Sequence, residues 1–456
     1  MNLLVATLTL AVAAPSVAND KVAVKAGMVH TLTGDPIENG VVVIEGGRIT
    51  AVGAPDQVQI PWDAVVLDLP DLVAAPGWVE AHTASGMDRA NETIDVAPFL
   101  NIRDSIDPVS FYFEDCLRSG ITTVNVQQGE QTVIAGVGMV VKPFGMTVEE
   151  MLVLPNSGVK MSASPKSGKS RATQAQALRE AFIELRAHLS QLVQEKRDGN
   201  DRARREALYQ GRDLTGERGK GRAMSSKAWN IDGLELVPRG EVDEKQEPLL
   251  DVVEGNLPVY FNCAAPMDVR LALEIAGDNG FTHRTVLFLA SSSCWKAADL
   301  IAMAGVPVIL GPSLTHTERD PITEEEVETF VPDVMKEKGI TWALSSRNST
   351  NESLWFQVAT CVANGMDRGE AIAAATTVPA GILGLSDRVG SLKPGADGNL
   401  VLYSGDPLSI TSFVEHVVIE GRHVYDRSKD VRSRLLLEGV QPDNTAAEPE
   451  NGEVRR

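Results

Sequence analysis

The middle of the chain alternates short apolar runs with stretches of helical periodicity, and this alternation limits the fold more than any other feature. The apolar runs predict eight strands, at 78–82, 121–126, 139–142, 153–161, 258–262, 285–289, 307–310 and 341–345. The segments between them predict helices at 111–118, 173–196, 267–278, 296–304, 323–337 and 353–364. Strands that alternate with crossover helices form parallel sheets, so we expect an α/β protein with a (β/α)8 TIM barrel.

Both ends of the chain have strand signals without intervening helices. Residues 41–44 and 48–52 flank a glycine turn typical of a hairpin, and short apolar runs at 399–403, 416–419 and 423–425 follow the predicted barrel. We expect residues 19–75 and 386–430 to form one small β-sandwich built from both termini. The barrel would occupy residues 76–385 between its two parts.

The first eighteen residues have the pattern of a signal peptide. The apolar run from Leu3 to Ala14 is too short to span a bilayer, and the small residues Ser16 and Ala18 fit a signal-peptidase cleavage site. We therefore expect a secreted or periplasmic protein. No later segment reaches membrane-spanning length, so no membrane span is expected.

Two further segments carry mainly polar and charged residues. Residues 196–254 form an insertion that is basic up to residue 222 and acidic from residue 235, without an apolar period. This insertion predicts a mobile surface excursion or a lid over a site. Residues 431–456 predict a disordered tail. The net charge of −20 argues against nucleic-acid binding, because phosphate recognition needs a positive surface.

The segment at 72–82, LVAAPGWVEAH, resembles the first barrel strand of the amidohydrolase superfamily, in particular its imidazolonepropionase-like branch. Residues 120–124, 304–314 and 379–397 resemble the second strand, the seventh strand and the exit from barrel to terminal domain. The resemblance implies one or two divalent metals at the mouth of the barrel, where metal-bound water attacks a C–N or related bond. The implied ligands are a His-x-His pair on strand 1, a Lys or Glu near strand 4, His on strands 5 and 6, and Asp on strand 8.

Only two positions of that ligand set keep a suitable side chain, His82 on strand 1 and Lys160 near strand 4. The other positions carry Ala84, Asn262, Ala264, Ala290 and, at or beside the strand 8 position, Ser346. A catalytic zinc site normally uses three protein ligands plus water. The sequence therefore predicts that the metal site is lost and that His82 is a vestigial metal ligand.

The polar residues that replace the ligands predict a metal-free pocket for a neutral or anionic small molecule, with Arg347 as the anion anchor. The candidate lining residues are His82, Lys160, Asn262, Ser291, Ser346 and Arg347. Cys263 and Cys294 end adjacent predicted strands and are a candidate disulfide in an oxidising compartment. Their alternative role is burial as small apolar residues.

Three functions stay open at this point. The first is a non-catalytic binding or partner subunit, a pseudoenzyme that needs no metal and dimerises with itself or with an intact amidohydrolase. The second is a divergent hydrolase acting on carbon–nitrogen bonds of a small amide, lactam or dipeptide, with zinc or another divalent metal. The third is a metal-free small-molecule binding protein. Fold alone does not decide among them.

Overall fold

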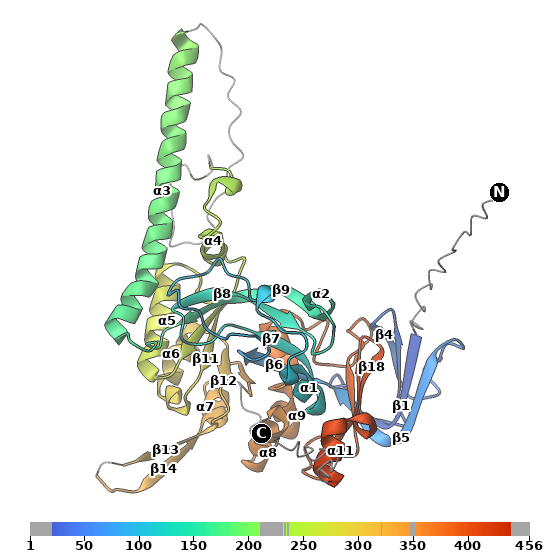
Figure 1. The fold of residues 1–456 in the computed structure, drawn as a ribbon. Helices are drawn as coiled ribbons and strands as arrows, with labels where there is room; N and C mark the ends of the chain where they lie inside the picture. Colours follow the sequence, from blue (N-terminus) through green and yellow to red (C-terminus); the bar gives the residue numbers. More distant parts are fainter. Residues whose placement is uncertain are drawn as a thin grey trace, which may run out of the picture.

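The computed structural model describes residues 21–209, 231, 234, 237–320, 322–346 and 353–438. The predicted signal peptide at 1–18, residues 210–230 of the charged insertion, residues 439–456 of the predicted tail, and Arg347 lie outside the described residues. Two eight-stranded sheets organise the fold, one in the middle of the chain and one built from its two ends (Figure 1).

The middle sheet is a nearly closed barrel. Its strand order is β15-β12-β11-β10-β9-β8-β7-β6. The strands are β6 (Trp78–Thr83), β7 (Ile121–Val126), β8 (Ile134–Val141), β9 (Leu152–Ser162), β10 (Val259–Cys263), β11 (Thr285–Leu289), β12 (Val308–Leu310) and β15 (Trp342–Leu344). The two edges meet where the Ser345 hydroxyl donates a 2.6 Å hydrogen bond to the carbonyl of His82.

One barrel strand departs from the predicted parallel arrangement. β8 runs antiparallel to both β7 and β9, whereas the other hydrogen-bonded neighbours in the barrel pair in parallel. The reason is the length of its connections. Residues 127–133 and 142–151 leave room only for α2 (Val148–Met151), and a parallel pair needs a crossover of a dozen residues or more.

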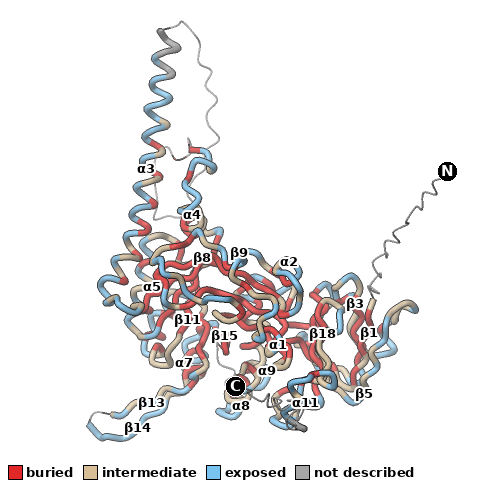
Figure 2. The backbone as a smooth tube through the Cα atoms, viewed as in Figure 1, coloured by how far each residue is buried: buried red, intermediate tan, exposed pale blue. Residues whose placement is uncertain are grey.

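Helices cover the outside of the barrel and share a large apolar core with it. They are α1 (Phe111–Arg118), α4 (Glu247–Val253), α5 (Pro266–Asp278), α6 (Ala298–Ala304), α7 (Val331–Glu337), α8 (Leu354–Ala363) and α9 (Arg368–Ala373). The helix α10 (Thr377–Ile382) packs with barrel strands in a separate apolar cluster. Burial is concentrated in the strands and in the helix faces turned toward them (Figure 2).

The helix predicted at 323–337 is wrong over its first half. Residues 315–330 form a hairpin of β13 (Thr315–Arg319) and β14 (Glu326–Phe330), and α7 begins only at Val331. The Asp320 carboxylate accepts hydrogen bonds from the backbone N–H groups of Ile322 and Thr323, and Glu324 adopts a φ of 61°. This turn chemistry interrupts the apolar pattern that suggested one helix. The hairpin projects from the body and is largely exposed (Figure 2).

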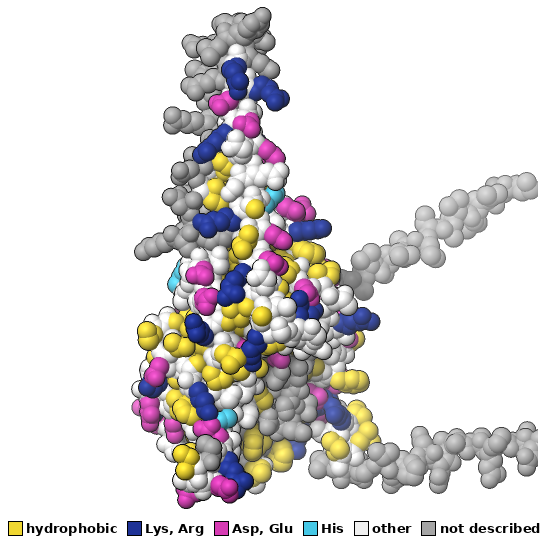
Figure 3. Space-filling model, turned by 90° about the vertical axis from the view of Figure 1, so that its left-hand side faces the viewer, with side chains coloured by type: hydrophobic (Ala, Val, Ile, Leu, Met, Phe, Trp, Pro, Cys, Tyr) yellow, Lys and Arg dark blue, Asp and Glu magenta, His cyan; other side chains and the backbone are white. Residues whose placement is uncertain are grey.

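The helix α3 (Arg171–Tyr209) continues well past the predicted end at residue 196. With 39 residues it is about 58 Å long. Apolar residues at helical spacing, Leu178, Phe182, Leu185, Leu189 and Val193, bury its first part in the barrel core. Beyond them it projects from the body with charged side chains of both signs along it (Figure 3). The first residues of the predicted insertion therefore extend this helix.

The second sheet joins strands from both ends of the chain. Its order is β18-β17-β16-β5-β1-β3-β4, with β2 paired to β1. The strands are β1 (Lys21–Val29), β2 (Ile37–Glu38), β3 (Val41–Glu45), β4 (Arg48–Gly53), β5 (Val65–Pro76), β16 (Leu400–Tyr403), β17 (Val414–Ile419) and β18 (Arg422–Asp426). The pairing gives one continuous terminal sheet, and the two-layer sandwich stays a prediction.

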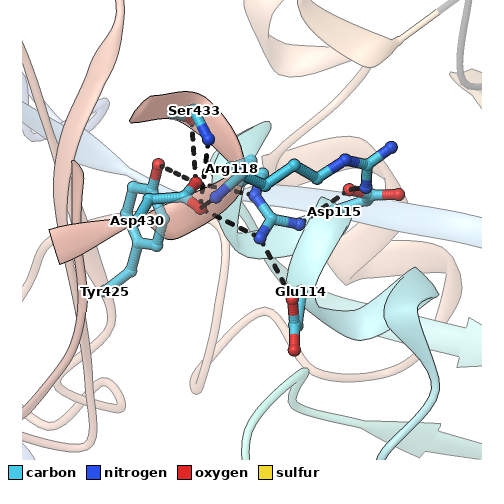
Figure 4. A network of polar contacts seen from close by, with 7 residues as sticks. Glu114, Asp115, Arg118, Tyr425, Asp430 and Ser433 are labelled. Carbon is cyan, nitrogen blue, oxygen red and sulfur yellow. Dashed lines mark hydrogen bonds and ion pairs between the residues drawn. The ribbon is translucent and has the colours of Figure 1, made fainter. Parts of the chain in front are cut away.

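Residues 431–438, placed in the tail by the sequence, form the helix α11 (Val431–Glu438). A buried ion pair holds its start against the barrel helix α1 (Figure 4). Arg118 Nε lies 2.7 Å from Asp430 Oδ2, and Tyr425 and Ser433 donate hydroxyl hydrogen bonds to the same carboxylate. This network stabilises the segment that charge and polarity alone suggested would be disordered. Among the described residues, no helix combines the length and apolar character needed to cross a bilayer.

Candidate functional site

His82 lies at the centre of the barrel interior. Its Nε2 is 2.5 Å from Lys160 Nζ on β9, and its ring stacks on Phe288 of β11 with 4.1 Å between ring centroids. Neither strand is a sheet neighbour of β6, so both contacts cross the interior. All three side chains are buried. The structure thus brings together the two residues predicted to survive from the metal site.

The contact between His82 and Lys160 engages the atom that a metal would use. Lys160 Nζ and His82 Nε2 share a hydrogen bond, and this bond occupies the Nε2 atom. Lys160 Nζ also lies 4.9 Å from the centroid of the Phe288 ring, where the π-electrons attract a cation. Coordination of a metal through Nε2 would require Lys160 to move away from both partners.

Glu80 of β6 is another buried ionisable group, and it was not singled out from the sequence. Its carboxylate accepts hydrogen bonds from the backbone N–H of Ser346 at 3.0 Å, from the Ser346 hydroxyl, and from the backbone N–H of His82 at 3.3 Å. Burial raises its pKa to about 7 against the opposing effect of these hydrogen bonds.

A polar network fills the interior beside β8. Gln127 Nε2 donates to Ser157 Oγ at 2.9 Å, and the Ser157 hydroxyl donates to Asn125 Oδ1 at 2.7 Å. Ser157 lies on β9, Asn125 lies on β7 and Gln127 directly follows β7. In the sheet, β8 lies between β7 and β9. Gly138 of β8 makes the contact possible, because a Cβ there would lie 2.2 Å from Gln127 Nε2. Sequence analysis gave no signal for this network.

The other predicted pocket residues are more scattered. Asn262 Nδ2 donates to Ser162 Oγ at 3.4 Å, and its buried Oδ1 has no hydrogen-bond partner. Ser346 contacts Glu80 as described above. Ser291 accepts a hydrogen bond from the backbone N–H of Ser293 at 3.3 Å, which starts the turn after β11. Arg347, the predicted anion anchor, lies outside the described residues.

Asp268 of α5 belongs to a buried cluster at the ends of β9 and β10. Its carboxylate accepts hydrogen bonds from the Ser164 hydroxyl at 2.7 Å and from the backbone N–H of Ala264 at 3.1 Å, and it pairs with Arg171. Three donors from three segments satisfy this carboxylate, so its evident role is to hold the loops after these strands. Ala264 itself is exposed and offers no side-chain ligand.

The described residues contain one group of three His, Cys, Asp or Glu side chains close enough to share an ion, and it does not lie in the barrel. It consists of His416, His423 and Asp426 on the terminal sheet. Among the described residues of the barrel, His82 and Lys160 match the implied ligand set, and the Glu80 carboxylate accepts hydrogen bonds from Ser346. The donor set there does not fit the three-ligand site that the resemblance implies.

Cys263 and Cys294, the candidate disulfide, are not joined in this structure. All four cysteines are free and buried. The Cys294 thiol donates to the backbone carbonyl of Cys263 at 3.3 Å, so it points at an oxygen and not at the other sulfur. Burial raises the pKa of both thiols, that of Cys294 to about 11. They pack as small apolar residues in the barrel core.

Comparisons with known proteins agree with this architecture. Residues 336–425 match the sequence model of the Amidohydrolase family. A curated relative, the amidohydrolase tasK of Hapsidospora irregularis, is 23% identical over an alignment of 422 residues, and the match covers 85% of this chain. The chain spans only 40% of the length of that relative. The solved structure of an amidohydrolase from Thermotoga maritima MSB8 covers 89% of this chain and 100% of its own, with 24% identity and a TM-score of 0.69. The chain therefore has the amidohydrolase fold.

Proposed function

We propose that this chain is a non-catalytic member of the amidohydrolase family, a binding or partner subunit whose barrel holds no catalytic metal. The observation that carries the proposal is the contact of His82 Nε2 with Lys160 Nζ at 2.5 Å. The metal site that the resemblance implies would use these two side chains as ligands. Here they bind each other and share the face of Phe288.

The remaining ligand positions support the same proposal. Three of them carry the methyl side chains of Ala84, Ala264 and Ala290, which have no lone pair to donate. Ser346 stands at or beside the acidic position on strand 8, and its hydroxyl already donates to Glu80. Activation of water by a metal needs several fixed ligands and an acceptor for the proton. These side chains supply neither.

The partner role is part of this proposal and takes two forms. The chain would pair with a second copy of itself or with an intact amidohydrolase, and it would contribute a surface and not a reaction centre. The projecting α3 and the β13–β14 hairpin are the elements that extend farthest from the body for such contacts (Figure 1). Light scattering of the purified protein, alone and mixed with the candidate partner, measures the resulting mass.

Glu80 supports a different candidate, a divergent hydrolase of carbon–nitrogen bonds. A carboxyl group with a pKa of about 7 is suited to accept or donate a proton near neutral pH. The side chain is fully buried, so a substrate would reach it only after the Ser345–Ser346 segment moves. The unpartnered Oδ1 of Asn262 supports a third candidate, a metal-free pocket for a small molecule with a hydrogen-bond donor.

Metal analysis of the full chain, purified without a histidine tag, tests the proposal. The protein is incubated with Zn²⁺, desalted and measured by mass spectrometry, beside His82→Gln. We expect the two proteins to hold the same amount of zinc, because His82 does not bind it. Zinc that the wild type retains and His82→Gln loses, together with hydrolysis of an amide, lactam or dipeptide, would overturn the proposal.

A further inference from the structure

His416, His423 and Asp426 meet on one face of the terminal sheet, remote from the barrel interior in sequence and in fold. His416 lies on β17 directly opposite Asp426 on β18. His423 Nε2 is 3.1 Å from His416 Nδ1, and His416 Nδ1 is 3.8 Å from Asp426 Oδ1. The three ligand atoms all lie within 4.8 Å of one another.

A β-bulge brings His423 to this face. The register of the two strands shifts between Val417 and Val418, so Val418 pairs with His423 and not with Val424. In a regular pair, residues 423 and 426 would point to opposite faces, because side chains alternate along a strand. The extra residue in β18 turns His423 toward Asp426, which is a known effect of bulges near functional sites.

The separations match those around a small divalent cation. Zinc binds imidazole nitrogen and carboxylate oxygen at about 2.1 Å, so two ligand atoms at a tetrahedral ion lie about 3.4 Å apart. The distances of 3.1 Å and 3.8 Å fall on either side of this value. Shifts of a few tenths of an ångström would place an ion between the three side chains.

The donor chemistry is also suitable. Two imidazoles and one carboxylate suit zinc and other divalent transition metals, which compete for such sites. The backbone N–H and hydroxyl of Ser428 donate to Asp426 Oδ1 at 3.1 Å and 2.6 Å and fix its orientation.

Lys429 is a nearby positive charge that opposes a cation. Its Nζ lies 2.8 Å from Asp426 Oδ2, and its side chain is 78% exposed. The exposed side chain can turn into solvent when an ion arrives, since such surface pairs contribute little. An ion has an open route to the site, because His423 and Asp426 also line a groove of about 1300 Å³ between α1, α11 and the terminal sheet.

We propose that His416, His423 and Asp426 form a binding site for a divalent transition metal of the zinc class on the terminal sheet. The site needs no residue of the barrel and is independent of the function proposed for it. Its three protein ligands leave room for water or for one further ligand atom, as in sites that are not closed.

Titration of the full chain with Zn²⁺ against a chromogenic chelator tests the proposal, again without a histidine tag. We expect one bound zinc per chain in the wild type. His416→Gln and His423→Gln should each weaken zinc binding by about a hundredfold or more. Loss of a residue that only orients a metal ligand already lowers metal affinity by up to about a hundredfold. His283→Gln is the matched control, because it removes an exposed histidine elsewhere on the surface.

Melting temperatures distinguish loss of the site from loss of the fold. Without metal, all variants should have the same melting temperature as the wild type. Saturating Zn²⁺ should raise the melting temperature of the wild type and of His283→Gln but not that of His423→Gln. Zinc binding that survives both substitutions at 416 and 423, or a wild type that binds none, would overturn the proposal. Zinc lost only in His82→Gln would overturn the barrel proposal instead.

Discussion

The carboxyl group of Glu80 makes the stability of this protein depend on pH in a way that can be measured. Burial raises its pKa from 4.5 to about 7. Between these values the folded state keeps a proton that the unfolded chain releases, so the free energy of unfolding falls as the pH rises. The stabilisation that the protonated Glu80 gives the folded state is fully present below pH 4.5 and is lost once the pH passes about 7. A shift of this size corresponds to about 3 kcal/mol.

Glu80→Gln removes the ionisation and keeps the shape of the side chain. Its amide oxygen can still accept from Ser346, while its NH₂ group faces the backbone N–H of His82 and loses the weaker 3.3 Å contact. We expect the variant to be slightly less stable than the wild type in acid. Between about pH 4 and about pH 8, the free energy of unfolding of the variant should rise by about 3 kcal/mol relative to that of the wild type.

Differential scanning calorimetry of both proteins across this range measures the effect. For a chain of 456 residues, the expected shift in melting temperature is about 3 °C. Glu38→Gln on β2, which changes an exposed carboxylate, should leave the pH profile as it is in the wild type. A Glu80→Gln profile that parallels the wild type from acid to alkaline pH would show that the carboxyl group ionises normally and refute the reasoning.

Three other outcomes are expected. A thiol reagent should modify none of the four buried cysteines rapidly in the native protein and all four after denaturation, and a fast-reacting thiol would contradict their burial. Asp430→Asn should cost about 2 kcal/mol, because it weakens the hydrogen bonds that the Asp430 carboxylate accepts from Arg118, Tyr425 and Ser433. Hydrogen exchange should then accelerate in α11, and unchanged protection there would refute the anchoring role. Gly138→Ala should cost about 1–3 kcal/mol through the clash with Gln127, measured as a lower melting temperature beside Gly240→Ala, where a Cβ has open space.

The barrel strands were readable from the sequence because each is a short apolar run bounded by polar residues or glycine. The strands predicted at 121–126 and 285–289 have the bounds of β7 and β11. Direction was harder to infer, since an apolar run looks alike in parallel and antiparallel strands. The short connections around β8 were the only signal of its reversal. The hairpin at 315–330 was missed because its turn chemistry outweighs the helical spacing.

The candidate site was only partly predictable for a related reason. Strand alternation shows which face a residue takes, but it does not show which residue it meets across a barrel. His82 and Lys160 were each named from the sequence, yet their contact spans 78 residues and depends on how the barrel closes. Glu80 looked like an ordinary strand residue, and its raised pKa comes from burial that only the folded chain provides.

The arrangement of the terminal sheet sets an order of events during synthesis. β5 lies between β1 and β16, so Pro76 pairs with Leu400. A nascent chain therefore carries one side of β5 with unpaired peptide groups until the whole barrel has been made. Exposed strand edges of this kind are where chains join one another and aggregate. A ribosome that stops before residue 400 should release a product that cannot complete this sheet.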